Sequence, residues 1–309
     1  MEADRAASAR KRRWLFCLLL CCAPLPLRWS QVRAFTALGL SDERYSYTLC
    51  VPLIVLFLLF FRRSSSCEKP LYCRALLLPV ALLAGALGLA PTRWLSLPVL
   101  LAALAVYWIA CFVLFYGARA AKQVVFPLGF LFLTIPLPPA LMDRAVTELQ
   151  RGSANTVSIL FQGAGIPVYQ QGVQLTLPGI EVQVAQECSG IRSSTALFLT
   201  AALAGQLLLR SGWSQALFAL LAIPIAIFKN ALRIFAISWL GIYVDPGFLH
   251  GRLHRYGGLP FSAVAVAMLV PFLFALRRWE AGRLTRIHPG DRGGPVPAHF
   301  RSKSDLSAV

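Results

Sequence analysis

The sequence predicts an all-α, polytopic membrane protein with about eight transmembrane helices, and three observations lead to this class. Of the 309 residues, 57% are hydrophobic, and the mean hydropathy is +0.65. Only 14% of the residues are charged, whereas a soluble domain carries about 25%. Apolar runs long enough to cross a bilayer core of about 30 Å recur along the chain, which excludes both a soluble globule and a disordered chain.

The apolar runs give the expected transmembrane helices: 14–29, 46–61, 75–91, 95–116, 124–142, 191–209, 214–240 and 258–276. Pro24 and Pro26 interrupt the first run, and four basic residues precede it, so a cleaved signal peptide is the competing interpretation there. We favour an uncleaved anchor, because no convincing small-residue cleavage site follows and Arg28 comes soon after. The domains expected are a basic cytoplasmic N-terminus (1–13), a transmembrane domain (14–276) and a disordered cytoplasmic tail (277–309), which is charged and rich in Gly and Pro.

Basic residues indicate which side of the membrane each loop occupies. The segments assigned to the cytoplasm hold 19 Lys and Arg residues, and those assigned to the opposite side hold 8. This asymmetry follows the positive-inside rule and predicts that both termini are cytoplasmic. Most of the net charge of +17 therefore reflects membrane topology, and nucleic-acid binding is not expected.

The outer segment 143–190 is the one long non-spanning stretch before the tail. Its first part, 144–162, places apolar residues at helical spacing among polar ones, which predicts an amphipathic helix on the outer membrane surface. Apolar and polar residues then alternate over 173–177 and 180–184, on either side of Pro178 and Gly179, which predicts a β-hairpin. The hairpin leads directly to Cys188, the one cysteine in a polar outer context.

Three polar residues are predicted to lie at one level of the membrane, toward its outer face. Cys188 begins the sixth predicted helix, Arg233 lies in the outer half of the seventh, and His254 precedes the eighth. A helix N-terminus lowers the pKa of a thiol and so favours the nucleophilic thiolate. A nearby imidazole can accept the thiol proton and later protonate a leaving amine, and a guanidinium can stabilise an oxyanion. Together they suit acyl transfer through a thioester.

Each residue also has an ordinary interpretation. A lone cysteine at a helix start is more often inert than catalytic, an arginine near the end of a span can extend to the headgroups, and a histidine in a short loop is usually only solvated. Composition and topology alone leave both interpretations open. No Gly-rich phosphate loop and no metal-ligand cluster occurs in the sequence, so no cofactor or metal is expected.

The sequence resembles the exosortase/archaeosortase family of integral-membrane cysteine transpeptidases over about residues 41–276. Three blocks carry the resemblance: Glu187-Cys188-Ser189-Gly190-Ile191-Arg192, Asn230-Ala231-Leu232-Arg233 and His254-Arg255-Tyr256-Gly257-Gly258. Weaker matches are Tyr45-Ser46-Tyr47 with Val51-Pro52, and Phe130-Leu131 with Ile135-Pro136-Leu137-Pro138. Many relatives have His at the position of Tyr47, a difference outside the three main blocks.

The resemblance implies that Cys188 is the nucleophile, Arg233 the oxyanion or substrate stabiliser and His254 the acid and base. His250 is the rival base, but Gly258 follows His254 at the family's spacing and favours His254. The sequence does not assign roles to Glu187, Lys229 or Asn230.

The function implied by the resemblance is cleavage of exported proteins at a C-terminal sorting signal of the PEP-CTERM type. Such a signal has a short motif such as Pro-Glu-Pro, a transmembrane helix and a basic cluster. The expected partners are these proteins, membrane lipids and an exopolysaccharide or lipid acceptor, and the expected location is the bacterial inner membrane with an extracytoplasmic active site.

The alternative is a transporter or export factor for a polysaccharide or lipid-linked substrate, in which Arg233 and Lys229 would bind anions; a purely assembly role is a third possibility. Transporters often contain internal repeats, and none is found here.

Overall fold

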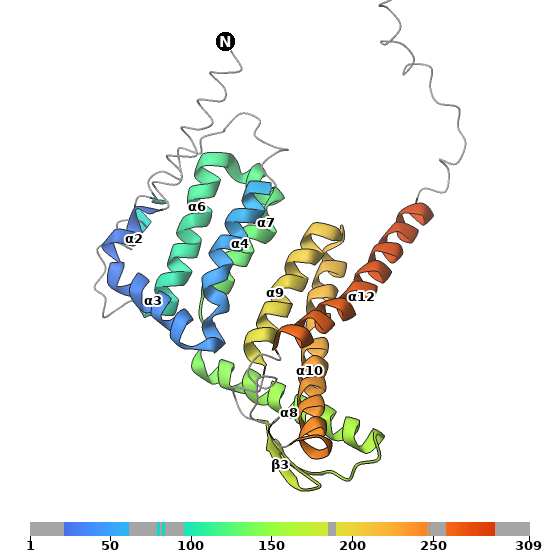
Figure 1. Cartoon of the computed structure of the whole chain (residues 1–309). Coiled ribbons are helices and arrows are strands. Elements are labelled where there is room, and N and C mark those ends of the chain that lie inside the picture. Colours follow the sequence, from blue (N-terminus) through green and yellow to red (C-terminus); the bar gives the residue numbers. More distant parts are fainter. Residues whose placement is uncertain are drawn as a thin grey trace, which may run out of the picture. The chain divides into compact units, whose positions relative to one another are not determined.

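The computed structural model describes residues 22–61, 79–80, 82–83, 96–184, 190–245, 247 and 258–287. The chain forms two compact units, residues 1–196 and 197–309, which are described separately (Figure 1). The described residues are mainly helical, with one small antiparallel sheet, and this confirms the predicted all-α membrane fold with its small β-structure.

Five helices in the described part of the chain are long and apolar enough to cross a membrane: Glu43–Phe60, Leu97–Gln123, Ile191–Leu208, Gly212–Tyr243 and Pro260–Arg283. They correspond to the predicted helices 46–61, 95–116, 191–209, 214–240 and 258–276. A bent pair, Val125–Thr134 with Pro139–Gly163, gives a sixth if it counts as one span. The first half of the predicted span 14–29 and most of the span 75–91 lie outside the described residues, so the count of about eight stays a prediction.

Before its sheet, the described part of the first unit contains six α-helices and two short 3-10 helices: α2 (Pro24–Leu27), α3 (Trp29–Ser41), η1 (Glu43–Tyr45), α4 (Tyr47–Phe61), α6 (Leu97–Gln123), α7 (Val125–Phe130), η4 (Leu131–Thr134) and α8 (Pro139–Gly163). In α6 the buried residues recur every three or four positions and form one stripe, Leu100, Leu104, Tyr107, Cys111 and Leu114. The helical path of α6 breaks at Gly117, where the predicted span 95–116 also ends.

The predicted fifth span, 124–142, is wrong as a continuous helix. Helical geometry ends at Thr134, and α8 begins at Pro139 after a bend of 97°. Pro136 and Pro138 explain the break, because proline lacks the N–H that a helix interior needs and disfavours helical geometry in the preceding residue.

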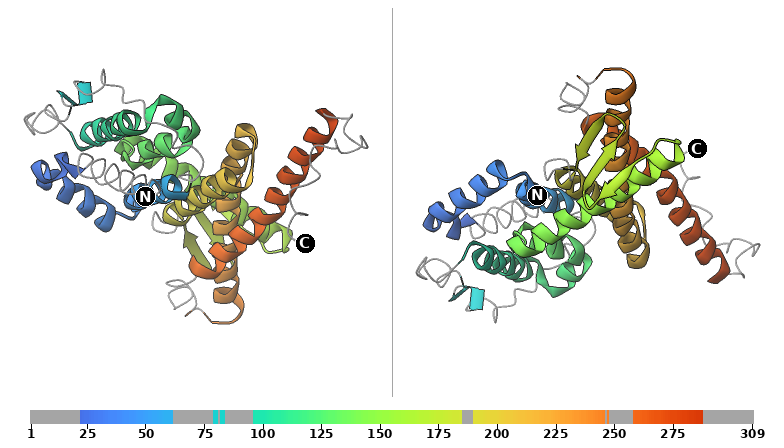
Figure 2. Two further views of the ribbon diagram at one scale, coloured as in Figure 1. Left: turned by 90° about the horizontal axis from the view of Figure 1, so that it is seen from above. Right: turned by 90° about the horizontal axis from the view of Figure 1, so that it is seen from below.

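The amphipathic helix predicted over 144–162 is present as α8, but its apolar face does not lie on the membrane surface as predicted. That face, which includes Met142, Val146, Val157 and Phe161, is almost fully buried within the protein. The strands of the sheet lie beside α8 in both views of Figure 2. The helix therefore presents its apolar side to protein, where the sequence suggested the membrane surface.

The sheet has three antiparallel strands in the order β1 (Tyr169–Gln171), β2 (Gln174–Leu177) and β3 (Ile180–Gln183). The β2–β3 hairpin is the predicted one, and its turn uses Gly179 at φ 79°, a left-handed conformation that favours glycine. Leu175 and Leu177 of β2 are 1% and 4% exposed, so one face of the sheet is buried. The strand β1 was not predicted, because its residues are polar and show no alternation.

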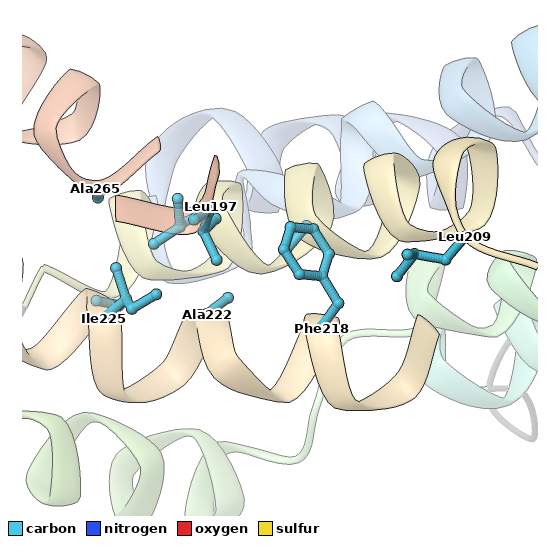
Figure 3. Packing of buried hydrophobic residues seen from close by; sticks show 9 residues of the cluster. Leu197, Leu209, Phe218, Ala222, Ile225 and Ala265 are labelled. Carbon is cyan, nitrogen blue, oxygen red and sulfur yellow. The ribbon is translucent and has the colours of Figure 1, made fainter. Parts of the chain in front are cut away.

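The second unit consists of most of α9 (Ile191–Leu208) with α10 (Gly212–Tyr243) and α12 (Gly258–Ile287). Leu197 of α9 and Leu209, the residue after that helix, pack with Phe218, Ala222 and Ile225 of α10 in its buried core (Figure 3). The helix α12 continues beyond residue 276 to Ile287, so the tail predicted to be disordered from residue 277 begins as helix. The rest of that tail lies outside the described residues.

A carboxylate joins α12 to the start of α10. The side chain of Glu280 accepts hydrogen bonds from the backbone N–H groups of Arg210 (3.0 Å) and Ser211 (2.8 Å). A helix start leaves backbone N–H groups without helical partners and carries partial positive charge. A carboxylate accepts hydrogen bonds from these groups, and its negative charge is favourable there.

Candidate active site

Aromatic residues on α10 give a scale for the depth of the polar site. Trp213 in the first turn is 72% exposed, and Trp239 near the other end is 37% exposed. Tryptophan is enriched at both membrane interfaces, and the 26 steps of about 1.5 Å from Trp213 to Trp239 span about 39 Å. Arg233 precedes Trp239 by six residues, about 9 Å along the helix, and lies within the candidate membrane span Gly212–Tyr243. A charged residue within a span is by default a hypothesis for a functional site.

Two further polar residues precede Arg233 on the same helix. Lys229 and Asn230 are 3% and 1% exposed, whereas Arg233 is only partly covered. Lys229 and Arg233 are four residues apart, so their charges lie one helical turn from each other. Two basic residues thus lie one turn apart in this part of α10.

The start of α9 is shaped by Gly190. Its φ of 70° is left-handed and favours glycine. Its carbonyl oxygen accepts hydrogen bonds from the N–H of Ser194 (2.7 Å) and the hydroxyl of Ser193 (3.0 Å), and these bonds close the first turn. The positive end of the α9 dipole thus lies at the residue that follows Cys188-Ser189 in the sequence.

The chain is also fixed on the other side of Cys188, at Val184. The N–H of Val184 donates to the carbonyl oxygen of Val173 (3.0 Å), and its own carbonyl oxygen accepts from the side chain of Gln150 (2.7 Å). Val184 is 1% exposed. The five residues that include Cys188 therefore connect two fixed points of the first unit, Val184 and Gly190.

The two weaker sequence blocks meet in the first unit. The hydroxyl of Tyr45 donates to the carbonyl oxygen of Leu137 (3.1 Å). The neighbouring Arg44 binds the carboxylates of Asp42 (2.8 Å) and Asp143 (2.9 Å). These contacts hold the turn before α4 against the start of α8.

The same turn also contacts α9. Glu43 forms an ion pair of 3.3 Å with Arg192, in the first turn of that helix. Residues from three distant parts of the sequence, around positions 43, 137 and 192, are thus brought together. Sequence reasoning missed Glu43, because an exposed carboxylate in a turn gives no signal of its partner.

Gln150 was also missed, although the sequence contains a signal for it. It follows Met142 and Val146 at four-residue spacing and so lies on the apolar face of α8. A polar side chain at such a position needs a hydrogen-bond partner, which here is Val184.

Of the predicted catalytic residues, the structure describes Arg233. Cys188, His254, the rival base His250 and Glu187 lie outside the described residues. Within the described ranges, no group of three or more His, Cys, Asp and Glu residues is arranged to hold a metal ion.

Comparison with protein families identifies the family of the chain. Residues 29–271 match the family described as transmembrane exosortase. The chain belongs to the transmembrane exosortase family. The match covers the three main sequence blocks and most of the region 41–276 over which the resemblance was seen. Comparisons with curated proteins and with solved structures found no match. The exosortase is therefore a multi-pass membrane protein of this family.

Proposed function

We propose that this exosortase is a cysteine transpeptidase of the bacterial inner membrane that cleaves C-terminal sorting signals of the PEP-CTERM type at the extracytoplasmic face. The family match is the observation that carries the proposal. The helix start at Gly190 and the depth of Arg233 support it, since one favours a thiolate and the other an oxyanion.

In the proposed reaction, the Cys188 thiolate attacks the carbonyl carbon of the scissile peptide bond. Arg233 stabilises the oxyanion of the tetrahedral intermediate. The C–N bond breaks as His254, which holds the proton taken from the thiol, protonates the leaving amine. The upstream part of the substrate remains as a thioester on Cys188.

The second half-reaction releases the enzyme. His254 removes a proton from the acceptor nucleophile, which attacks the thioester carbonyl, and the thiolate leaves. The acceptor, by this proposal, is a lipid or an exopolysaccharide. The reaction requires no cofactor, because the thiol, the guanidinium and the imidazole supply the nucleophile, the charge and the proton transfers.

The experiment expresses the chain with a signal-bearing substrate and follows the substrate size by immunoblot. Cys188→Ala should leave the substrate at full length, and Cys188→Ser should be nearly as inactive, because a hydroxyl ionises far less readily than a thiol. Arg233→Lys should fail as well, since Lys lacks the planar fork of donors. Cys50→Ala is the matched control, because Cys50 is an exposed cysteine of α4 and should be replaceable.

The choice of base is tested in the same assay. His254→Ala should abolish processing, and His250→Ala should leave most of it; the reverse result would assign the base to His250. Normal processing by Cys188→Ala would exclude cysteine transpeptidation and favour a transporter, in which the thiol has no role.

A further inference from the structure

The strand β3 has an edge whose backbone groups point away from the sheet. Leu177 and Ile180 flank the two-residue turn and form the pair that closes it. The N–H of Val184 donates to the carbonyl oxygen of Val173, so Val173 and Val184 are a hydrogen-bonded pair directly beyond the end of the same two strands. Hydrogen-bonded and non-hydrogen-bonded pairs alternate in an antiparallel ladder. The N–H and C=O groups of Glu181 and Gln183 therefore face away from β2.

This edge is open within the part of the chain that the structure describes. The strand order is β1-β2-β3, so no described strand pairs with β3 on its outer side. The side chains of Glu181 and Gln183 are exposed. At the opposite edge of the sheet, β1 has one residue whose backbone N–H and C=O groups face away from β2, Gln170. Its side chain donates to Asn155 (2.7 Å) and to the carbonyl oxygen of Gly172 (3.0 Å).

We propose that the outer edge of β3 binds the substrate by strand addition, pairing with the extended segment that precedes the substrate's transmembrane helix. An open edge that presents alternate N–H and C=O groups is complementary to an extended backbone. The strand continues to Val184, and Cys188 is four residues further along the chain. This inference rests on the proposed function and adds how the substrate is recognised.

The size of the edge favours a substrate over a second copy of the exosortase. Four residues span about 13 Å, and a stable protein dimer buries about 1,200–2,000 Å², far more than a four-residue edge supplies. A substrate needs less from this contact, because its own helix keeps it in the same bilayer and so raises its effective concentration.

The chemistry of the edge also defines a register. Where a Pro-x-Pro segment is added, the central residue directs its N–H and C=O toward β3, and the two prolines lack only N–H groups that would point outward. An acidic central residue opposite Glu181 would place like charges together. The favoured register therefore puts that residue opposite Gln183, the outward-facing residue nearer to Cys188.

The first test removes one backbone donor. Gln183→Pro deletes the outward N–H and keeps the bonds between β2 and β3, because the N–H of residue 183 does not face β2. Substrate processing should fall about tenfold relative to Gln183→Ala, which retains the N–H. Gln170→Pro, the same change at the opposite edge, should process like the wild type. Equal rates for Gln183→Pro and Gln183→Ala would overturn the inference, whereas absence of processing by the wild type would instead overturn the proposed function.

The second test does not depend on how well a proline is tolerated. A photo-crosslinking amino acid is placed at Gln183 in the Cys188→Ala variant, which should accumulate uncleaved substrate. Irradiation should yield an adduct with the full-length substrate, and the same group at Gln170 should not. An adduct with a second copy of the exosortase, or none with the substrate, would contradict strand addition.

Discussion

Glu43 and Arg192, which are 149 residues apart in the sequence, form an ion pair of 3.3 Å that links the turn before α4 to the first turn of α9. Both side chains are 67% exposed, so the pair contributes only about 0–1 kcal/mol to stability. The pair therefore matters mainly because it holds the Arg192 side chain in place, in the first turn of the helix that follows Cys188 in the sequence.

The first prediction uses this charge. Arg192→Glu should raise the pKa of the Cys188 thiol, because it replaces a cation near the helix start by an anion. The pH dependence of Cys188 alkylation, followed for each cysteine by mass spectrometry, should shift to higher pH. Arg192→Lys, which retains the charge, is the control and should alkylate like the wild type. Identical profiles for all three proteins would show that the charge does not reach the thiol.

The second prediction concerns the carboxylate that caps α10. Glu280→Gln should lower the free energy of unfolding by about 1–2 kcal/mol, because a neutral amide is a weaker acceptor for the N–H groups of Arg210 and Ser211. Thermal unfolding in detergent measures the change. Glu148→Gln is the control, since Glu148 forms an exposed ion pair with Arg151 and its replacement should cost less than about 0.5 kcal/mol. Equal unfolding temperatures for the two variants would contradict the capping role.

The third prediction is a pH dependence. Hydrogen bonding from the Arg44 guanidinium is the largest cause that holds the pKa of Asp42 below its ordinary value of 3.8. Because this pKa is lower in the folded than in the unfolded chain, the interaction stabilises the fold above about pH 4 and is lost as pH falls through the folded-state pKa.

Asp42→Asn should therefore be less stable than the wild type at pH 7, by up to about 1 kcal/mol for a partly exposed pair. The difference should stay constant down to about pH 5 and shrink below pH 4. Thermal unfolding of both proteins across this range is the measurement. A difference that persists unchanged at pH 3 would mean that ionisation of Asp42 is not its cause.

The fourth prediction tests the membrane topology. Because cytoplasmic segments are expected to hold 19 of the basic residues against 8 outside, reporters fused after Arg210 and after Ile287 should be cytoplasmic. A reporter within 163–172, between α8 and β1, should be external. A cytoplasmic result at this third position would place Val184 and the start of α9 on the wrong side for the proposed reaction.

The sequence predicted the spanning helices well because length and hydropathy decide them. The predicted boundaries for α4, α9 and α10 lie within a few residues of those observed. The prediction of the fifth span was wrong because hydropathy does not show where a helix bends. Residues 124–142 are apolar, yet Pro136 and Pro138 end the helix, and α8 begins after a bend of 97°. The β2–β3 hairpin was predictable because alternation and Pro178-Gly179 agreed.

The candidate site was predictable only where a residue was unusual in its own surroundings. Arg233 stood out as a charge within an apolar helix, and Gln150 could have been recognised as a polar residue on an apolar face. Glu43 and Arg192 are ordinary surface charges, and their pairing depends on how distant segments pack. Local sequence patterns do not contain that information.

The division of the proposed catalytic groups along the chain has a consequence for biosynthesis. Val184 and Gly190, the fixed points on either side of the thiol, belong to the first unit, whereas Arg233 and His254 follow in the second. At a synthesis rate of about 5–20 residues per second, the 64 residues from Gly190 to His254 take roughly 3–13 s to emerge. By the proposed mechanism, the nascent chain has its nucleophile during this interval but lacks its acid and base, so proteins that cross the membrane beside it would not be cleaved until the last helix is inserted.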